Sequence, residues 1–340
     1  MTNRTVLRST FALFVTLLLS ASAHAGLFRA YVSSTGNDAN ACTLQAPCRL
    51  LPAALAAIND GGEIWMLDSA NYNTGPVNIA KSVTILAIPG AVGSVLAIIP
   101  GSAGGNAINI ATAGVKVTLR NLMIVPMPGA YSVHGIRMSA GASLTVENCL
   151  IANLPGSGIY VTTAAIVRVA DTTIRDNYYS SVWLQDGASG SITRSTFNGN
   201  GGTGVYVYGL AANTTTTVNI ADSTFDGNNT GGVYFKSDTV TAVIKAAIRD
   251  SRLTGSNFGG VEITSSGAAL KLTLSNNLIS NNGTAIAVGS FSEVWTTGNT
   301  ISENGYGLYN SGGLLKTSGN NTLSNNTTDT VGTITPVATM

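Results

Sequence analysis

The stretch Leu144-Thr-Val-Glu-Asn-Cys-Leu-Ile151 returns in altered form as Val218-Asn-Ile-Ala-Asp-Ser-Thr-Phe225. Both alternate apolar and polar residues, as a strand with one buried face does, and both end on a large apolar residue. We call this last residue the anchor; neighbouring anchors lie 22 to 28 residues apart. The nine anchors are Ile124, Ile151, Ile174, Phe197, Phe225, Leu253, Ile279, Ile301 and Leu323. Such a period indicates a repeat architecture.

Each repeat reads as one short alternating strand, a polar turn rich in Asn and Gly, and a second short strand. Gly158-Ile-Tyr-Val161 and Gly204-Val-Tyr-Val207 are examples of the second strand. Gly, Asn and Thr interrupt every repeat, so helical repeats are disfavoured. Constant strands joined by turns of variable length favour a parallel β-helix, in which each coil bonds to the next through its main chain.

Two polar positions recur at fixed distances from the anchor. Two residues before it stand Cys149, Thr172, Ser195, Ser223, Ser251, Asn277, Asn299 and Asn321. Three residues after it stand Asn177, Asn200, Asn228, Asn282, Asn304 and Asn326, with Leu154 and Ser256 interrupting the series. Asn tolerates left-handed turns, and its amide can bond the equivalent amide one coil away. We predict ladders that hold the coils together rather than a binding surface.

The two ends of a solenoid need covers, because an open end exposes apolar core and strand edges. We predict a helix from Arg49 to Asp60, with Pro52 in its first turn and Leu51, Leu55 and Ile58 on the face that covers the N-terminal end. The predicted division is a cap over residues 26–80, coils over 81–326 and a polar tail or cap over 327–340.

The first 25 residues have the pattern of a bacterial secretory signal peptide. Arg4 and Arg8 precede the apolar run Phe11 to Leu19, and Ala23-His24-Ala25 supplies a cleavage site. The alternative is an uncleaved anchor. No later segment is long enough to span a membrane. We therefore expect a secreted or periplasmic protein, and a formal net charge of +1 implies no basic surface for nucleic acid.

The cysteines agree with export. Cys42 and Cys48 bracket a short loop, and in an oxidising compartment we expect them to form a disulfide; metal binding is the alternative. Cys149 is left over and is expected to be a buried, inert thiol.

Several N-terminal segments carry a family resemblance: Tyr31-Val-Ser-Ser-Thr-Gly-Asn-Asp38, Pro47-Cys-Arg-Leu-Leu51 and Gly61-Gly-Glu-Ile-Trp-Met-Leu67. They resemble the cap of pectate-lyase-like right-handed β-helix proteins, and the later coils resemble the repeat of that superfamily. The resemblance implies an all-β, single-domain right-handed parallel β-helix with an N-terminal capping helix. The superfamily holds polysaccharide lyases, glycoside hydrolases, esterases, phage tailspikes and noncatalytic surface proteins, so the fold does not select a function.

The motifs that mark the enzymes of this superfamily are incomplete. The paired-aspartate hydrolases carry Gly-His-Gly, of which only His134-Gly135 is present, and we interpret His134 as a surface or turn residue. Their Asn-Thr-Asp, Asp-Asp and Arg-Ile-Lys motifs are absent, as are the Arg-x-Pro-x-x-Arg and Trp-x-Asp-His patterns of pectate lyases.

Charged residues recur three positions before the anchor. That file holds Asn148, Asp171, Arg194, Asp222, Asp250 and Asn276. Coils stack about 4.8 Å apart, so Asp222 and Asp250 could share a Ca²⁺ ion. A lyase of this fold would use the ion to acidify the proton beside a uronate carboxylate, with Arg194 or a neighbouring arginine as the base. In the alternative, Arg194 pairs with Asp171 and Asp222 across coils, and the file is structural.

An aromatic file occupies the second strands. Tyr160, Trp183, Tyr206 and Tyr234 precede Glu262 at one repeat position, and their neighbours Ile159, Val182, Val205, Val233 and Val261 are apolar. Alternation must turn the rings outward. Gln185, Tyr208 and Lys236 follow two residues later on the same face. Sugar rings stack on aromatic faces while polar neighbours bond their hydroxyls. The alternative is that the rings only stabilise the sheet, or that a loop covers them.

The sequence thus favours an exported, noncatalytic protein that binds a polysaccharide or glycan surface along this file. The alternative is a divergent Ca²⁺-assisted polysaccharide lyase or another carbohydrate-active enzyme, and a purely structural role stays open.

Overall fold

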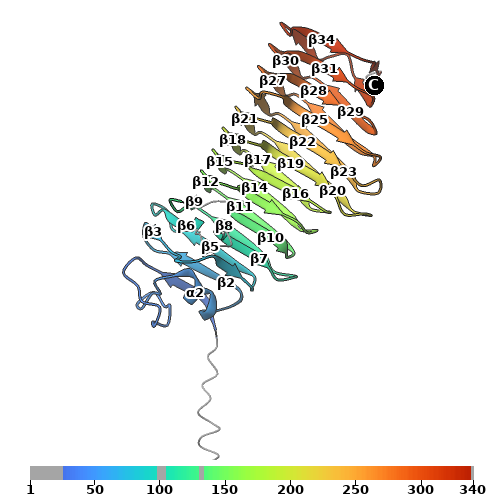
Figure 1. Ribbon diagram of the computed structural model, residues 1–340. Coiled ribbons are helices and arrows are strands. Elements are labelled where there is room, and N and C mark those ends of the chain that lie inside the picture. Colours follow the sequence, from blue (N-terminus) through green and yellow to red (C-terminus); the bar gives the residue numbers. More distant parts are fainter. Residues whose placement is uncertain (1–25, 98–104, 130–133, 338–340) are drawn as a thin grey trace, which may run out of the picture.

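The computed structural model describes residues 26–97, 105–129 and 134–337, and the predicted signal peptide lies outside these ranges. The chain winds as one continuous stack of coils (Figure 1). Its strands pair in parallel into three sheets of 13, 11 and 11 strands, which we call sheets A, B and C. The predicted all-β, single-domain parallel β-helix is confirmed.

Sheet A contains β1 (Leu27–Val32), β2 (Ile58–Met66), β5 (Val83–Ala87), β8 (Lys116–Arg120), β11 (Ser143–Glu147), β14 (Ile166–Ala170), β17 (Ser189–Thr193), β20 (Thr215–Ala221), β23 (Val243–Arg249), β26 (Leu270–Ser275), β29 (Ser292–Thr297), β32 (Leu314–Thr317) and β35 (Ile334–Pro336). Sheet B contains β3 (Ala70–Asn71), β6 (Gly93–Ala97), β9 (Leu122–Pro126), β12 (Leu150–Ala152), β15 (Thr173–Arg175), β18 (Thr196–Asn198), β21 (Thr224–Asp226), β24 (Arg252–Thr254), β27 (Leu278–Ser280), β30 (Thr300–Ser302) and β33 (Thr322–Ser324). Sheet C contains β4 (Val77–Ile79), β7 (Ile108–Ala111), β10 (Ile136–Ala140), β13 (Ile159–Val161), β16 (Val182–Gln185), β19 (Thr203–Gly209), β22 (Gly231–Ser237), β25 (Gly259–Ser265), β28 (Thr284–Val288), β31 (Tyr306–Asn310) and β34 (Thr328–Val331).

A regular coil has three strands, whereas the sequence pattern predicted two. The eight residues from Leu144 to Ile151 are divided between β11 and β12 by a corner at Asn148, whose φ is 51°. The same left-handed corner recurs at Asp171, Arg194, Asp222, Asp250 and Asn276. Asn and Asp visit this conformation more readily than other residues that carry a side chain. The prediction of a single strand was wrong because a one-residue corner leaves the alternation of apolar residues almost undisturbed.

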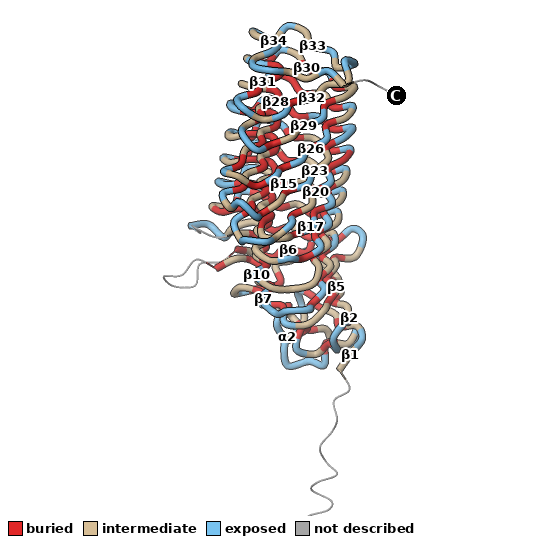
Figure 2. Tube along the Cα trace, turned by 90° about the vertical axis from the view of Figure 1, so that its right-hand side faces the viewer, coloured by how far each residue is buried: buried red, intermediate tan, exposed pale blue. Residues whose placement is uncertain are grey.

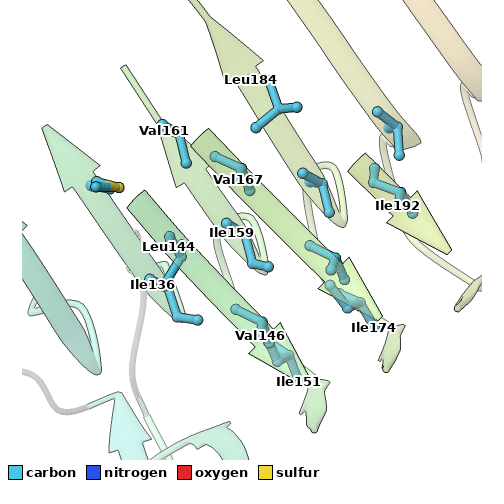
Figure 3. Close-up of a cluster of buried hydrophobic side chains, with 14 of the residues drawn as sticks. Ile136, Leu144, Val146, Ile151, Ile159, Val161, Val167, Ile174, Leu184 and Ile192 are labelled. Carbon is cyan, nitrogen blue, oxygen red and sulfur yellow. The ribbon is translucent and has the colours of Figure 1, made fainter. Parts of the chain in front are cut away.

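The anchors form one file along sheet B. Ile151 pairs with Ile124 on one side and Ile174 on the other, and the same register continues coil by coil to Leu323. Phe197 and Phe225 stack within this file, with ring centroids 4.9 Å apart. Aliphatic side chains from all three sheets meet inside the coils (Figure 3), and buried residues run up the stack as far as Leu315, whereas the last coil has none (Figure 2).

Hydrogen-bonded ladders join the coils at two turns, as predicted. Between sheets B and C, the Asn177 amide donates to Asn200 Oδ1 at 3.0 Å, and Asn200 donates to Asn228 Oδ1 at 2.7 Å. Between sheets A and B, Asn277 donates to Asn299 Oδ1 at 2.9 Å. These asparagines are buried, so their amides are structural partners of one another and of the turns.

The N-terminal helix α2 (Leu51–Ala57) is shorter than predicted. Pro52 lies in its first turn, and Leu51 and Leu55 are buried, as expected. Ile58 is buried too, but it begins β2 instead of extending the helix. The ammonium group of Lys81 donates to the carbonyl oxygens of Leu55, Ala56 and Ile58 at 3.2, 3.3 and 2.7 Å. The ammonium group thus takes the place of the main-chain N–H groups that would bond these carbonyl oxygens if the helix continued.

The coils extend beyond the predicted limits of 81 and 326. β2, β3 and β4 precede residue 81, and β34 and β35 continue sheets C and A as far as Pro336. Near the N-terminus, Cys42 and Cys48 are joined by a disulfide, with Cα atoms 4.6 Å apart. Cys149 is buried, and burial raises the pKa of its thiol to about 12. Within the described ranges, no helix is long and apolar enough to cross a membrane.

Candidate functional site

The aromatic residues predicted to face outward lie side by side on sheet C. Tyr160, Trp183, Tyr206 and Tyr234 occupy successive strands in one register. The residues that flank each ring along its strand are fully buried: Ile159, Val161, Val182, Leu184, Val205, Val207, Val233 and Phe235. Because side chains alternate across a strand, buried neighbours direct each ring to the outer face.

These rings contact one another continuously. Centroids are 4.7 Å apart from Tyr160 to Trp183, 5.0 Å from Trp183 to Tyr206, and 5.4 Å from Tyr206 to Tyr234. The rings face outward, as predicted, and their mutual contacts leave each of them half-buried. Burial raises the pKa of the Tyr234 hydroxyl to about 12. The file is a continuous, partly desolvated aromatic surface.

His134 extends the file by one coil. It lies in the turn before β10, and its ring centroid is 4.9 Å from that of Tyr160. Its Nδ1 accepts the main-chain N–H of Ser157 at 2.9 Å. Burial, together with the nearby Arg137, lowers the pKa of His134 to about 4. The imidazole is therefore neutral at physiological pH and serves as one more ring.

A hollow of about 320 Å³ lies over the middle of the file. Trp183, Tyr206 and Tyr234 form its floor, and Tyr179, on the turn before sheet C, forms one wall. Tyr179 is 50% exposed. The rings thus line a concave surface, and ligand-binding sites are usually concave and lined by aromatic side chains.

The polar residues expected beside the aromatic file differ in exposure and in their hydrogen-bond partners. Tyr208 donates its hydroxyl to Asp238 at 2.8 Å, and Lys236 pairs with the same carboxylate at 2.9 Å. Lys236 and then Tyr208 lower the pKa of Asp238. Gln185 is buried and donates to Asp186 at 2.8 Å, so the expectation that it faces a ligand was wrong. The strand ends at Gln185, and its amide serves the following turn.

Glu262 follows Tyr234 in the same register and borders a second hollow, of about 430 Å³. Phe258, Tyr306 and Tyr309 line it as well. Burial raises the pKa of Glu262. Since Gly231 pairs with Gly259 and Tyr234 with Glu262, the two hollows follow one another along sheet C. We call them together the sheet C groove.

The carboxylate file lies elsewhere, at the corner between sheets A and B. Arg194 donates from Nε and Nη2 to the two carboxylate oxygens of Asp171 at 2.7 and 2.8 Å, which lowers the pKa of Asp171. Asp250 pairs with Arg249 at 2.7 Å. In the described ranges, no three His, Cys, Asp or Glu side chains gather closely enough to hold a metal ion. Ca²⁺ prefers six to eight oxygen ligands, of which Asp222 and Asp250 would supply only a part, so the shared Ca²⁺ ion stays a prediction.

The backbone conformation of the corner explains why aspartates occur at these positions. Asp222 and Asp250 have φ values of 52° and 51°, the conformation for which Asp and Asn are suited. The structure brings Asp222, Asp250 and Arg194 into one file, but that file is separate from the aromatic surface on sheet C.

The sequence matches the family model described as "Right handed beta helix region" over residues 101–244 and 239–334. The chain belongs to this family. No curated protein matches the sequence significantly. Among solved structures, this β-helix protein is similar to pectate lyase Pel9A at 14% identity, with a TM-score of 0.56 and coverage of 90% of this chain and 78% of that one.

Two further similar structures come from other enzymes. The Agl-KA catalytic domain matches at 16% identity and a TM-score of 0.56, covering 85% of this chain and 65% of that one. The A-module of the Azotobacter vinelandii mannuronan C-5 epimerase AlgE6 matches at 14% identity and a TM-score of 0.52, covering 85% and 95%. The resemblance to pectate-lyase-like right-handed β-helix proteins is thereby confirmed for the fold.

The sequence reasoning missed the aromatic residues of the second hollow. Tyr309 lies in the register of the aromatic file, through Ala287 and Glu262. In most coils this position follows the anchor by nine residues, but from Ala287 onward it follows by eight, so a fixed offset misses it. A search that allowed a turn shorter by one residue would have found Tyr309.

Proposed function

We propose that this β-helix protein binds a polysaccharide along the sheet C groove without breaking it down. The observation that carries the proposal is the continuous file of Tyr160, Trp183, Tyr206 and Tyr234, four rings in mutual contact. Three of them, Trp183, Tyr206 and Tyr234, line the first hollow of the groove. Aromatic faces that line a concave surface suit the apolar faces of sugar rings.

The chemistry around the groove supports binding over catalysis. Lys236 and Asp238 neutralise one another, and His134 is tied to the main chain. The carboxylates first considered for catalysis lie at another edge of the coil. The similar structures include proteins named pectate lyase and mannuronan C-5 epimerase, which makes a polysaccharide the natural ligand class to test, although the likeness is one of fold.

The proposed location is outside the cytoplasm, secreted or periplasmic. The pattern from Arg4 to Ala25 supports export. The disulfide between Cys42 and Cys48 supports an oxidising compartment, because cytosolic thiols are kept reduced.

The aromatic file and the groove together set a length for the ligand. From Tyr160 to Tyr309 there are six steps between neighbouring coils in the sheet C register. At about 4.8 Å for each step, the surface is about 29 Å long. Affinity should therefore rise with the length of an oligosaccharide until the oligosaccharide spans the groove.

The test is binding of the chain from Gly26 onward to a panel of polysaccharides. The double variant Trp183→Ala/Tyr206→Ala should lose binding while keeping the far-ultraviolet spectrum of the fold. Trp295→Ala is the matched control, because Trp295 is exposed on sheet A. Equal binding by wild type and the double variant would contradict the proposal.

The same samples separate the alternative functions. An absorbance rise from unsaturated uronates in the presence of Ca²⁺ would indicate the polysaccharide lyase, and Asp222, Asp250 and Arg194 would then be substituted. Absence of both binding and turnover across the panel would favour a structural role.

A further inference from the structure

The second hollow of the sheet C groove differs chemically from the first. It lies over β25, β28 and β31, one coil beyond the last ring of the aromatic file. Phe258, Tyr306 and Tyr309 line it together with Glu262. The first hollow, over Trp183, Tyr206 and Tyr234, has no charged side chain among the described residues that line it.

Two rings of this hollow are exposed to solvent. Phe258 is 64% exposed and Tyr306 is 43% exposed. Tyr306 and Tyr309 meet edge to face, with centroids 5.5 Å apart and an angle of 65° between the rings. Exposed aromatic surface gathered in a concave place marks a binding site more often than it marks incidental exposure.

Among the described residues that line this hollow, Glu262 is the only charged one. It is half-buried, and none of the hydrogen bonds or salt bridges of the described residues involves its carboxylate. Lys236 belongs to the neighbouring strand and is held by Asp238 at 2.9 Å. A carboxylate that loses part of its hydration and gains no partner costs free energy, which a bound cation would offset.

A carboxylate surrounded by aromatic faces suits one ligand group above others. An ammonium ion forms a charge-assisted hydrogen bond with the carboxylate and a cation–π contact with the rings. A uronate would be repelled by Glu262, and a neutral sugar would leave the charge uncompensated. We propose that the second hollow receives the ammonium group of an amino sugar within the glycan, an inference that rests on the proposed function.

The test compares oligomers of glucosamine and of N-acetylglucosamine of equal length by isothermal titration calorimetry. Acetylation removes the positive charge and keeps the sugar ring. Wild type should bind the glucosamine oligomer about tenfold more tightly, which corresponds to about 1.4 kcal/mol. Glu262→Gln keeps the shape of the side chain and should abolish this preference, because the glucosamine oligomer loses its ionic partner while the acetylated oligomer never had one. Glu293→Gln, on sheet A, is the matched control.

The outcomes separate this inference from the proposed function. Equal affinity of wild type for both oligomers, or an unchanged preference in Glu262→Gln, overturns the amino-sugar site while glycan binding stands. If neither oligomer binds but another polysaccharide of the panel does, the amino-sugar site is likewise wrong and the proposed function holds.

Discussion

Replacement of one buried asparagine tests whether the ladders hold the coils together. Asn282 is 4% exposed, and its Nδ2 donates to the carbonyl oxygens of Leu253 and Ser280 at 3.1 and 3.0 Å and to Asn304 Oδ1 at 3.1 Å. Its Oδ1 accepts the main-chain N–H of Ser256 at 3.0 Å. Asn282→Ala removes all four contacts and leaves the Ser256 N–H buried without an acceptor.

The expected loss of stability follows from that count. The two hydrogens of Nδ2 share three acceptors, so the four contacts amount to about three hydrogen bonds. At a net value of about 1 kcal/mol for each hydrogen bond, Asn282→Ala should lower the free energy of unfolding by about 3 kcal/mol. Water that enters the vacated space would recover part of this, to a loss of about 2 kcal/mol. Because neighbouring coils stabilise one another, the loss should be accompanied by faster amide exchange in the coils of Ser256 and Asn304.

Urea unfolding followed by tryptophan fluorescence measures the change, provided that the dependence on urea concentration stays the same. Asn219→Ala is the matched control: Asn219 is exposed on sheet A, and its replacement should change the free energy of unfolding by less than about 0.5 kcal/mol. A loss below about 1 kcal/mol for Asn282→Ala would refute the assignment of the ladder as a main stabilising feature.

Four other measurements probe the fold and the site. Phe225→Ala should cost about 3–5 kcal/mol in urea unfolding, since the ring is fully buried, whereas Phe258→Ala on the surface should cost little. At the corner, Asp222→Asn should preserve stability and Asp222→Val should cost about 1–2 kcal/mol, because a β-branched residue disfavours positive φ; a rise in melting temperature of the wild type with Ca²⁺ would instead point to a metal site. Cys149 should resist an aromatic disulfide reagent at pH 8 until the protein unfolds, since burial raises its thiol pKa to about 12. The NMR titration of His134 should show a pKa of about 4, so this residue should add to stability above its unfolded pKa of about 6.5 and lose that contribution as the pH falls toward 4; a value near 6.5 would contradict the buried, neutral imidazole.

The repeat could be predicted from the sequence because equivalent positions in successive coils of a solenoid have the same surroundings. Anchors such as Ile151 and Phe225 fill the same interior space, and asparagines such as Asn282 bond their equivalents, so identity of environment becomes similarity of residue type. The outward direction of Trp183 followed as well, since strand alternation is a local property of the backbone.

Other features depended on where the chain turns. A single left-handed residue at Asn148 splits one apparent strand into two, and the local alternation of side chains hardly records it. Asp222 and Asp250 occupy the same corner in later coils, where the positive φ favours aspartate. The corner lies between sheets A and B, so these carboxylates are separate from sheet C.

The amino-acid sequence by itself determined the coil, its core and the aromatic file, because these repeat with the chain and rest on local periodicity. Only the tertiary structure decided that Gln185 is buried, that His134 continues the aromatic file, and that Glu262 shares a hollow with Phe258 and Tyr309. Such contacts join residues of different coils across turns of unequal length, and a difference of one residue in a turn is enough to change which side chains meet.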